Sequence, residues 1–319
     1  MATGFQPDQV TDRSALAVVV GSVSDEHLLA VINRLPMDDV AIFDAETLSG
    51  ADFLLLPGSV RIGELQFSAA KPVRGWLRRL APPDWQRGLV LESHDAVVKA
   101  AWLSLLISIA RTCGVQWLTE PEALVGAENK LVQAIAAQQL GIATPETIVT
   151  NDPDELCGAF HEEFVIKPLG PGHFYDGEDA RVVYTTVLHR DSPELARLRT
   201  APFLAQRKLT AIKHLRVVTV LDRIWAASID GDDWPLDWRS AANAHSAFVA
   251  AKLPTAVADG ALLLVDHLKL GYSSQDWLIC EDGCYVVDIN PAGQWLFLPE
   301  PIASSVAEAI ARWVGGGTR

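Results

Sequence analysis

Cysteine is scarce in this sequence, and its spacing does not suit a metal knuckle or a redox pair. The chain has four cysteines among 319 residues, too few for a disulfide scaffold, and no C-x-x-C pair occurs. Two of them, Cys280 and Cys284, flank the turn-like triplet Glu281-Asp282-Gly283, which is typical of a β-hairpin. We therefore expect structural free thiols without a metal or redox role.

Long apolar runs are also missing. The first one, residues 15–20, is six residues long, far short of the roughly 20 that a membrane-spanning helix needs. The N-terminal residues contain no basic segment followed by an apolar one, as a secretory signal would require. These absences predict a cytoplasmic protein with no membrane partner.

Positive charge is in the minority. Lysine and arginine number 26 against 40 aspartate and glutamate residues, so the net charge is −14 and the sequence pI is about 4.9. Proteins that bind nucleic acids gain their affinity for phosphate from clustered lysine and arginine. The charge balance therefore argues against a nucleic-acid partner, and an anionic ligand must meet a local group of cations.

Several common catalytic motifs are absent as well. No G-x-x-x-x-G-K-[ST] segment occurs, which excludes a Walker-type phosphate loop, and no G-x-G-x-x-G follows the first predicted strand, which argues against a dinucleotide oxidoreductase. No Ser-His-Asp or Cys-His arrangement is evident, and the eight histidines show no spacing typical of metal ligands. The chemistry must therefore rest on other groups.

Apolar residues, by contrast, make up 49% of the chain, and charged residues only 21%. This balance excludes disorder, and the length suggests about two domains or one multilobed unit. The first part of the chain reads as α/β. Its apolar pattern predicts strands at residues 15–20, 40–43, 52–56, 60–67 and 73–77, the fourth with an irregularity near Gly63, and helices near 28–35 and over 89–113. The second of these helices is apolar on most faces, which predicts burial between layers or in a subunit interface.

The rest of the chain mixes helices with antiparallel strand pairs. Helices are predicted over residues 127–140, after Asp152, over 255–268 and over 302–313. Strands are predicted at residues 147–149, 164–167, 182–187, 203–207, 215–220, 224–229, 276–280 and 284–289. Residues 230–248 read as an ordered loop.

Polar groups on the last predicted hairpin form the clearest candidate site. Asp276 opens its first strand, and Asp288 and Asn290 end its second, where the i, i+2 spacing places both side chains on one face. Such oxygen groups suit Mg²⁺, which commonly shares its ligands with nucleotide phosphates. The alternative interpretation is a polar strand end capped by turn chemistry.

Two lysines and an arginine are the candidate phosphate ligands. Lys130 starts a helix, and Lys167 ends an apolar strand just before a loop with Gly170 and Gly172. A lysine there is costly unless an anion meets it, and glycines let backbone N–H groups approach phosphate. Arg216, among apolar neighbours on a strand, needs an anionic partner, either a structural carboxylate or a ligand. The alternative for each lysine is a solvated charge.

The order of these pieces resembles that of the ATP-grasp superfamily. A closer resemblance, from about residue 73 to the C-terminus, is to the microviridin-type, or graspetide, ligases that install side-chain macrocycles in ribosomal peptides. The segments that carry it are Trp76-Leu77-Arg78-Arg79, Ala127-Glu128-Asn129-Lys130, Thr150-Asn151-Asp152-Pro153, Val165-Ile166-Lys167-Pro168-Leu169, Tyr184-Thr185-Thr186, Asp237-Trp238-Arg239 and Asp288-Ile289-Asn290-Pro291-Ala292-Gly293-Gln294-Trp295.

The resemblance implies an ATP-grasp fold of the α/β (α+β) class. An N-terminal α/β domain would occupy residues 1–120. A small central α+β lobe with a lid loop would occupy residues 121–200, and a C-terminal α+β lobe with the metal site residues 201–319. ATP would lie between the last two lobes.

The resemblance also implies roles for individual residues. Lys130 and Lys167 would contact the phosphates, and the loop with Gly170 and Gly172 would form the lid. The hinge would start at Gln206, and the main chain of Arg207 and Leu209 would read the adenine edge. Mg²⁺ would be held by Asp276, Asp288 and Asn290, although the family more often has Glu at the position of Asp288. Arg216 would meet the γ-phosphate or the acyl phosphate. The substrate carboxylate would be gripped by Arg78, Arg79 and Arg239. His214 would lie near the ribose, at a position where relatives commonly carry an acid.

The implied activity is an ADP-forming ligase reaction. An Asp or Glu side chain of a ribosomal precursor peptide, consisting of leader and core, would be activated by ATP and joined to a hydroxyl or amine in a macrocycle. The alternatives are a ligase that joins a small carboxylic acid or amino acid to an amine, and a nucleotide-binding partner protein without turnover. We also expect a homodimer.

Overall fold

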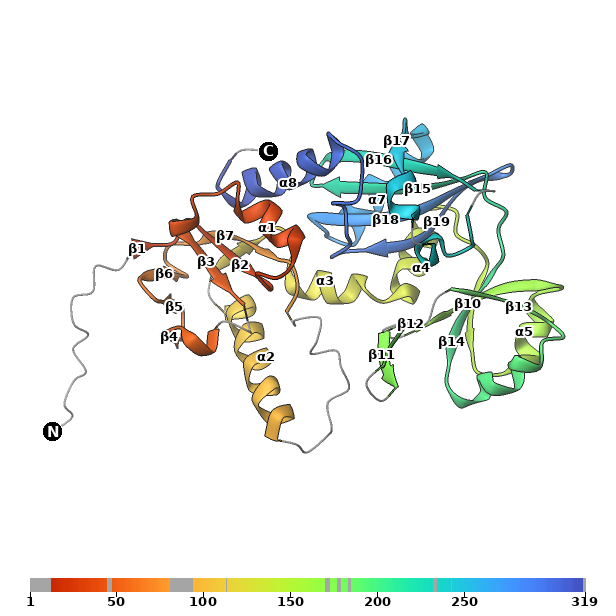
Figure 1. Cartoon of the computed structure of the whole chain (residues 1–319), viewed down its shortest axis with the longest axis horizontal. Helices are drawn as coiled ribbons and strands as arrows, with labels where there is room; N and C mark the ends of the chain where they lie inside the picture. Colours follow the sequence, from red (N-terminus) through yellow and green to blue (C-terminus); the bar gives the residue numbers. More distant parts are fainter. Residues whose placement is uncertain are drawn as a thin grey trace. The chain divides into compact units, whose positions relative to one another are not determined.

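The computed structural model describes residues 13–44, 48–80, 94–112, 114–169, 173–176, 179–182, 185–231, 234–241 and 243–317 (Figure 1). The chain divides into two compact units. The first combines Met1–Pro121 with Ala307–Arg319, and the second is Glu122–Val306. No helix in these described ranges has the length and hydropathy needed to cross a membrane.

The first unit is built on a parallel sheet with the strand order β3-β2-β7-β8. The strands are β2 (Ala17–Val20), β3 (Val40–Phe43), β7 (Val73–Leu77) and β8 (Val115–Trp117). All four residues of β2 are buried, as expected for a parallel strand covered on both faces. Its helices are α1 (Glu26–Ile32), α2 (His94–Thr112) and the later part of α8 (Ile302–Val314), with short 3₁₀ turns η1 (Met37–Asp39) and η2 (Leu48–Gly50).

A second sheet of the first unit contains the irregularity predicted near Gly63. It is a complete turn, because Gly63 adopts a φ of 53° in the left-handed region and turns the chain back. Two antiparallel strands result, β5 (Ser59–Ile62) and β6 (Leu65–Ser68). They complete the sheet order β1-β6-β5-β4 with β1 (Arg13–Ser14) and β4 (Phe53–Leu56).

Helix α2 is buried only toward its C-terminal end. Leu106 and Ile109 are each 1% exposed, whereas Val97 is 64% and Val98 39% exposed. Layer packing within the chain therefore explains only part of the apolar surface of this helix. The predicted residues 89–93 and Cys113 lie outside the described residues.

The second unit contains a small antiparallel sheet with the order β13-β10-β14-β9. Its elements are β9 (Thr147–Thr150), α5 (Pro153–Ala159), β10 (Glu163–Pro168), β13 (Thr186–His189), η4 (Pro193–Thr200) and β14 (Phe203–Arg207). Its core centres on Leu156, Phe160 and Phe164. The strand predicted over residues 182–187 is wrong, because β13 begins only at Thr186 and Val182 ends the separate hairpin β11 (His173–Asp176) and β12 (Asp179–Val182).

A larger antiparallel sheet follows, with the order β17-β16-β15-β18-β19. Its strands are β15 (Lys213–Val220), β16 (Arg223–Asp230), β17 (Val249–Ala250), β18 (Tyr272–Cys280) and β19 (Gly283–Asn290). The helices of this part are α3 (Pro121–Ala127), α4 (Lys130–Gln139), η5 (Trp238–Ser240), α6 (Ala244–Ala247) and α7 (Thr255–His267). Apolar side chains of α4 and α7 pack on one face of this sheet, against Val217, Trp277 and Ile289 among others. The opposite face is therefore free to carry the polar site.

The start of α4 differs from the prediction. The sequence pattern predicts one helix from residue 127, but Asn129 has an extended backbone and its side chain accepts hydrogen bonds from the N–H groups of Leu131 and Val132. This N-cap separates α4 from the short α3 and places Lys130 in the first turn of α4.

Candidate active site

Three charged residues lie in a row across the centre of the large sheet. Arg216 on β15 is paired in register with Asp276 on β18, and Asp276 is paired with Asp288 on β19. Directly opposite residues of antiparallel strands point to the same face. The Arg216 Nη1 atom lies 3.2 Å from Asp276 Oδ1. The structure thus brings together two predicted metal ligands and the predicted phosphate-binding arginine.

A β-bulge makes this row possible. From the hairpin turn, the register runs regularly to Trp277 opposite Val286, and it shifts by one residue before Asp276. In a regular ladder Asp276 would face Val287, and Asp288 would face Gln275, which is fully buried and hydrogen-bonded to α7. The extra residue on β19 moves Asp288 to the same face as Asp276. Asp276 lies in the middle of β18, which corrects the prediction that it opens the strand.

The two predicted lysines converge on β19. Lys130 reaches Asp288 Oδ1 at 2.5 Å, because β19 is the sheet edge next to the start of α4. Lys167 at the end of β10 donates to the Val287 carbonyl oxygen at 3.1 Å, at the bulge itself. Burial lowers the pKa of Lys167 to about 8, against the opposing attraction of Asp288. Two cations therefore flank the carboxylate pair.

The two carboxylates differ in how readily they ionise. Burial raises the pKa of Asp276, and the charge of Asp288 raises it further, against the lowering effect of Arg216. Burial acts in the same direction on Asp288, but Lys130 and Lys167 outweigh it and the pKa of Asp288 lies below its ordinary value. A divalent cation between the two oxygens would relieve this repulsion.

An aromatic box surrounds Arg216. Its guanidinium carbon lies 5.4 Å from the centre of the Trp238 ring and 5.5 Å from that of Phe297. Phe248 and His245 complete the box, with ring centres 5.0 and 5.5 Å from that of Trp238. The Arg216 side chain is 8% exposed, and its buried Nε has no hydrogen-bond partner. Packing rather than hydrogen bonding therefore holds most of this guanidinium in place.

We predict that Trp238→Leu lowers kcat of the proposed ligase about tenfold with little change in KM for ATP, because a misplaced Arg216 costs transition-state stabilisation. Steady-state kinetics measures both constants. Trp238→Phe should restore most of kcat. Trp225→Leu is the matched control, because it removes another arginine–tryptophan contact, the one with Arg223 at 4.9 Å. Equal losses in the Trp225 and Trp238 variants would contradict the role of the box.

Gln133 is a site residue that the sequence analysis missed. It is buried, its Nε2 donates to the carbonyl oxygens of Ala127 at 2.7 Å and Ile289 at 2.6 Å, and its Oε1 accepts from the Ile289 N–H at 2.9 Å. It therefore grips the main chain of β19 between Asp288 and Asn290. The available signal was its position three residues after Lys130, on the same helix face.

Gln133→Leu is expected to lower activity about tenfold and the free energy of unfolding by about 2 kcal/mol, because buried main-chain groups of β19 lose their partners. Thermal unfolding and ligation kinetics would measure the two effects. Gln138→Leu, on an exposed position of the same helix, should change neither. An unaffected Gln133 variant would show that β19 needs no such clamp.

Asn290 caps the turn that follows β19, which is the alternative interpretation of a polar residue at a strand end. Its Oδ1 accepts from the Ala292 N–H at 3.1 Å, which begins the turn after β19. The turn returns close to β18, because a Cβ atom on Gly293 would lie 2.5 Å from the Ser274 Cβ. Two carboxylates and this amide are the available oxygen donors. No cluster of three or more His, Cys, Asp or Glu side chains occurs elsewhere among the described residues.

Arg239 is held beside the site by Asp237. The two side chains form a bidentate pair, with Nε–Oδ1 and Nη2–Oδ2 distances of 2.7 Å. The Asp237 hydrogen bond raises the pKa of Arg239, and the charges of Asp276 and Asp288 act in the same direction. Arg239 remains 50% exposed, so it can meet an incoming carboxylate.

The predicted hinge connects the two sheets of the second unit. Gln206 is buried and donates to Thr147 Oγ1 at 3.0 Å, and Leu209 packs against Leu278 and Cys280. The Arg207 N–H donates to the Glu146 carbonyl oxygen at 2.9 Å, so that N–H is used within the protein. His214 is buried on β15, and burial lowers its pKa.

A narrow cavity of about 20 Å³ lies between these groups, lined by Lys130, Lys167, Gln206 and Asp288 among others. Small-molecule sites usually measure a few hundred Å³. The cavity is therefore much smaller than a nucleotide needs, and Lys167, in contact with the Val287 carbonyl oxygen, forms part of its wall.

The remaining predicted site residues are Arg78, Arg79, Gly170 and Gly172. Arg78 lies in the first unit, is 1% exposed in its side chain and pairs through Nε with Asp25 at 3.0 Å. That pairing commits its Nε to an internal carboxylate. Arg79 is next to it at the end of β7. Gly170 and Gly172 lie outside the described residues.

No protein-family model matches the sequence, and no curated protein matches it. Several solved structures, however, are similar to this chain in fold. An ATP-grasp ligase associated with ribosomal peptides from Chryseobacterium gregarium, in complex with ADP and a leader and core peptide, has a TM-score of 0.78 at 20% identity over 95% of this chain and 96% of that one. The chain has the ATP-grasp fold.

Other ATP-grasp structures extend this likeness. The macrocyclase MdnC from Microcystis aeruginosa, bound with the precursor peptide MdnA, has a TM-score of 0.75 at 23% identity, covering 93% of this chain and 98% of that one. D-alanine–D-alanine ligase from Bacillus anthracis, complexed with ATP, is less similar, with a TM-score of 0.53 at 14% identity, covering 93% of this chain and 94% of that one. The predicted fold is confirmed.

Proposed function

We propose that this protein is an ATP-dependent ligase that forms macrocyclic ester or amide crosslinks in a ribosomal precursor peptide. The observation that carries the proposal is the row Arg216–Asp276–Asp288 with Lys130 and Lys167 beside it. Phosphoryl transfer needs cations that position and neutralise phosphate groups, not a covalent nucleophile on the enzyme. This arrangement offers such cations together with oxygen ligands for a metal.

Each charged group has a role in this proposal. Lys130 and Lys167 contact the ATP phosphates, and Arg216 meets the γ-phosphate. Asp276, Asp288 and Asn290 hold Mg²⁺, which when bound neutralises charge on the phosphates. The main chain near Leu209 faces the adenine, and the buried His214 lies toward the ribose.

The reaction proceeds in two transfers. A carboxylate oxygen of a peptide Asp or Glu attacks the γ-phosphorus, the bond to the β-phosphate oxygen breaks, and ADP leaves. A hydroxyl or amine then attacks the acyl carbon of the acyl phosphate, and the bond from this carbon to the phosphate oxygen breaks. An ester or amide forms, and the proton given up by the hydroxyl or the neutral amine leaves with inorganic phosphate. Arg239 orients the peptide carboxylate for the first transfer.

A peptide substrate is favoured over a small one. The Chryseobacterium gregarium ligase and MdnC each have a precursor, leader or core peptide in their complexes. The likeness to D-alanine–D-alanine ligase supports the second candidate, a ligase that joins a small acid or amino acid to an amine. Arg78 and Arg79 would then be free of any role in peptide binding.

We further propose that the protein works in the cytoplasm as a homodimer through the exposed apolar start of α2. Val97 and Val98 lie there, and Trp102 packs its ring 5.9 Å from that of Phe53, which is itself 39% exposed on β4. Val97→Glu should convert the dimer into a monomer in light scattering coupled to size exclusion, because a charge cannot be buried in the interface without a partner. Val125→Glu, at an exposed valine in the second unit, should leave the dimer intact.

Intact-mass analysis tests the activity. The chain is co-expressed with each short open reading frame beside its gene, and loss of one water per bond is expected in one of the peptides. Tandem fragmentation then distinguishes esters from amides. ATP turnover triggered by small acids and amines, with no modified peptide, would instead establish the second candidate.

A further inference from the structure

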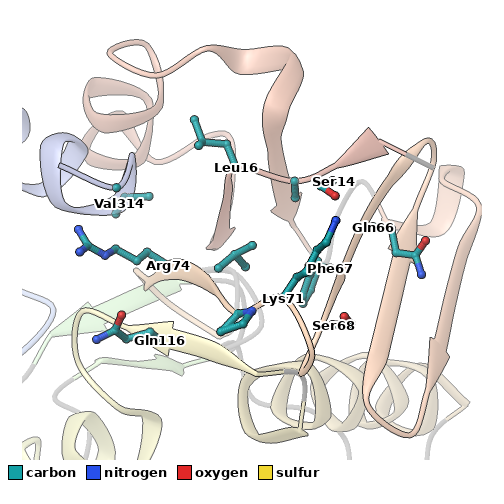
Figure 2. A pocket seen from close by; sticks show the side chains of 13 residues that line it. Ser14, Leu16, Gln66, Phe67, Ser68, Lys71, Arg74, Gln116 and Val314 are labelled. Atoms are coloured by element: carbon teal, nitrogen blue, oxygen red, sulfur yellow. The ribbon is translucent and has the colours of Figure 1, made fainter. Parts of the chain in front are cut away.

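The first unit contains a cavity of about 670 Å³, which lies within the range of ligand sites. It is lined by the start of β7, by β6, by Gln116 of β8 and by the end of α8. Figure 2 shows Arg74 between Val314 and Gln116 in this view, with the amine end of Lys71 toward Ser14. All of these residues belong to the first unit, so this cavity is separate from the site on the large sheet.

The charge of this cavity is opposite to that of the chain. Among its thirteen lining residues, Lys71 and Arg74 are cationic and none is acidic, although the chain carries a net charge of −14. Arg74 is fixed in place, because its Nη1 donates to the carbonyl oxygens of Trp313 at 2.9 Å and Gly317 at 2.6 Å. Both partners are neutral, so the positive charge of Arg74 stays available to an anion.

The walls of the cavity suit a peptide. Among the described residues, β1 and β8 are edge strands of the two sheets of this unit, and Ser14 and Gln116 of these strands line the cavity. Edge strands offer main-chain N–H and C=O groups to an added strand. Leu16 is 42% exposed and provides an apolar contact. The ligand that matches these walls is an extended peptide in which carboxylate side chains, which pair with the cations, alternate with apolar side chains.

We propose that this cavity binds an extended acidic segment of the peptide substrate, with its carboxylates on Lys71 and Arg74. The inference rests on the proposed function, because it supplies a second anchoring point for a peptide whose reacting side chain must reach Asp276 and Asp288. Such an anchor raises the effective concentration of the reacting segment at the site.

The test uses the full chain and a fluorescein-labelled hexapeptide of alternating glutamate and valine, followed by anisotropy. We expect binding that weakens about tenfold when glutamine replaces glutamate in the peptide and about tenfold in Lys71→Glu. Gln116→Glu, a second exposed position on the cavity wall, should weaken binding similarly. Arg197→Glu is the matched control, because it makes the same charge change at an exposed arginine of η4 in the second unit, and it should leave binding within twofold.

No binding of the acidic peptide at about 1 mM would overturn the proposal, as would equal weakening by Arg197→Glu and Lys71→Glu. This readout requires neither ATP nor turnover, so it stands or fails independently of ligation. Once a precursor is identified, Lys71→Glu should raise its KM about tenfold with kcat unchanged. Active ligation with an unchanged KM in Lys71→Glu would refute the anchor while leaving the proposed function intact.

Discussion

Replacing Asp288 with asparagine is expected to lower ATP-dependent ligation by about a thousandfold or more. The Asp288 carboxylate accepts a hydrogen bond from Lys130 and lies opposite Asp276 in the sheet. It is also one of the proposed Mg²⁺ ligands. An amide keeps the shape but removes the negative charge that a metal ligand needs, and the loss of such preorganised charge typically costs two to three orders of magnitude or more. Loss of water from a precursor peptide, followed by intact mass over time, measures the effect.

The control for this variant is Asp282→Asn. Asp282 lies in the turn of the same hairpin and accepts a hydrogen bond from the Tyr285 hydroxyl at 2.9 Å, far along the strands from the carboxylate row. It should retain full activity. Circular dichroism and thermal unfolding should show a folded Asp288→Asn protein, and undiminished ligation in this variant would refute the assigned metal site.

Lys167→Met is expected to weaken ATP binding about 30-fold at pH 7, because a charge-assisted contact to phosphate is lost. Burial lowers the pKa of Lys167 to about 8. In the wild-type protein the lysine therefore loses its proton as the pH rises through about 8. ATP binding should weaken about tenfold between pH 7 and pH 9. Isothermal titration calorimetry at several pH values measures this profile.

The sign of the effect follows from which form binds. The charged lysine attracts phosphate, so ATP binding is strongest below the pKa of Lys167. Above this pKa, Lys167 takes up a proton when ATP binds. Lys167→Met should remove this step from the profile, whereas Lys252→Met, at an exposed lysine, should keep it. A wild-type profile that stays flat from pH 7 to pH 9 would show that Lys167 does not face the phosphates.

Most of the fold could be predicted from local patterns. The apolar runs that become β2, β7 and β15 and the helix that becomes α7 were predicted within a few residues, because burial of a regular face repeats along the chain. The irregularity predicted near Gly63 within residues 60–67 proved to be a full hairpin turn, since one glycine at positive φ decides between a strand and a hairpin. The helix predicted from residue 127 failed because the capping side chain of Asn129 outweighs a continuous apolar pattern.

The candidate site divides in the same way. Residue types and their order pointed to Lys130, Lys167, Arg216 and the Asp276/Asp288 pair, because charged groups at the ends or centres of apolar strands need partners. Gln133 could not be ranked in this way, because a glutamine in an amphipathic helix looks the same whether it is solvated or clamps a strand 156 residues away. The partners of Arg216 in the aromatic box also come from three separate segments, with His245 and Phe248 together at α6.

The sequence by itself determined the class of elements, the order of the charged residues and the absence of other nucleotide-binding motifs, because each is a local property of the chain. The tertiary structure alone decided how Asp276 and Asp288 come to share the face that their positions on the hairpin predicted. That outcome depends on one extra residue in β19, and a bulge changes the register of every later pair without altering the apolar pattern that marks the strand.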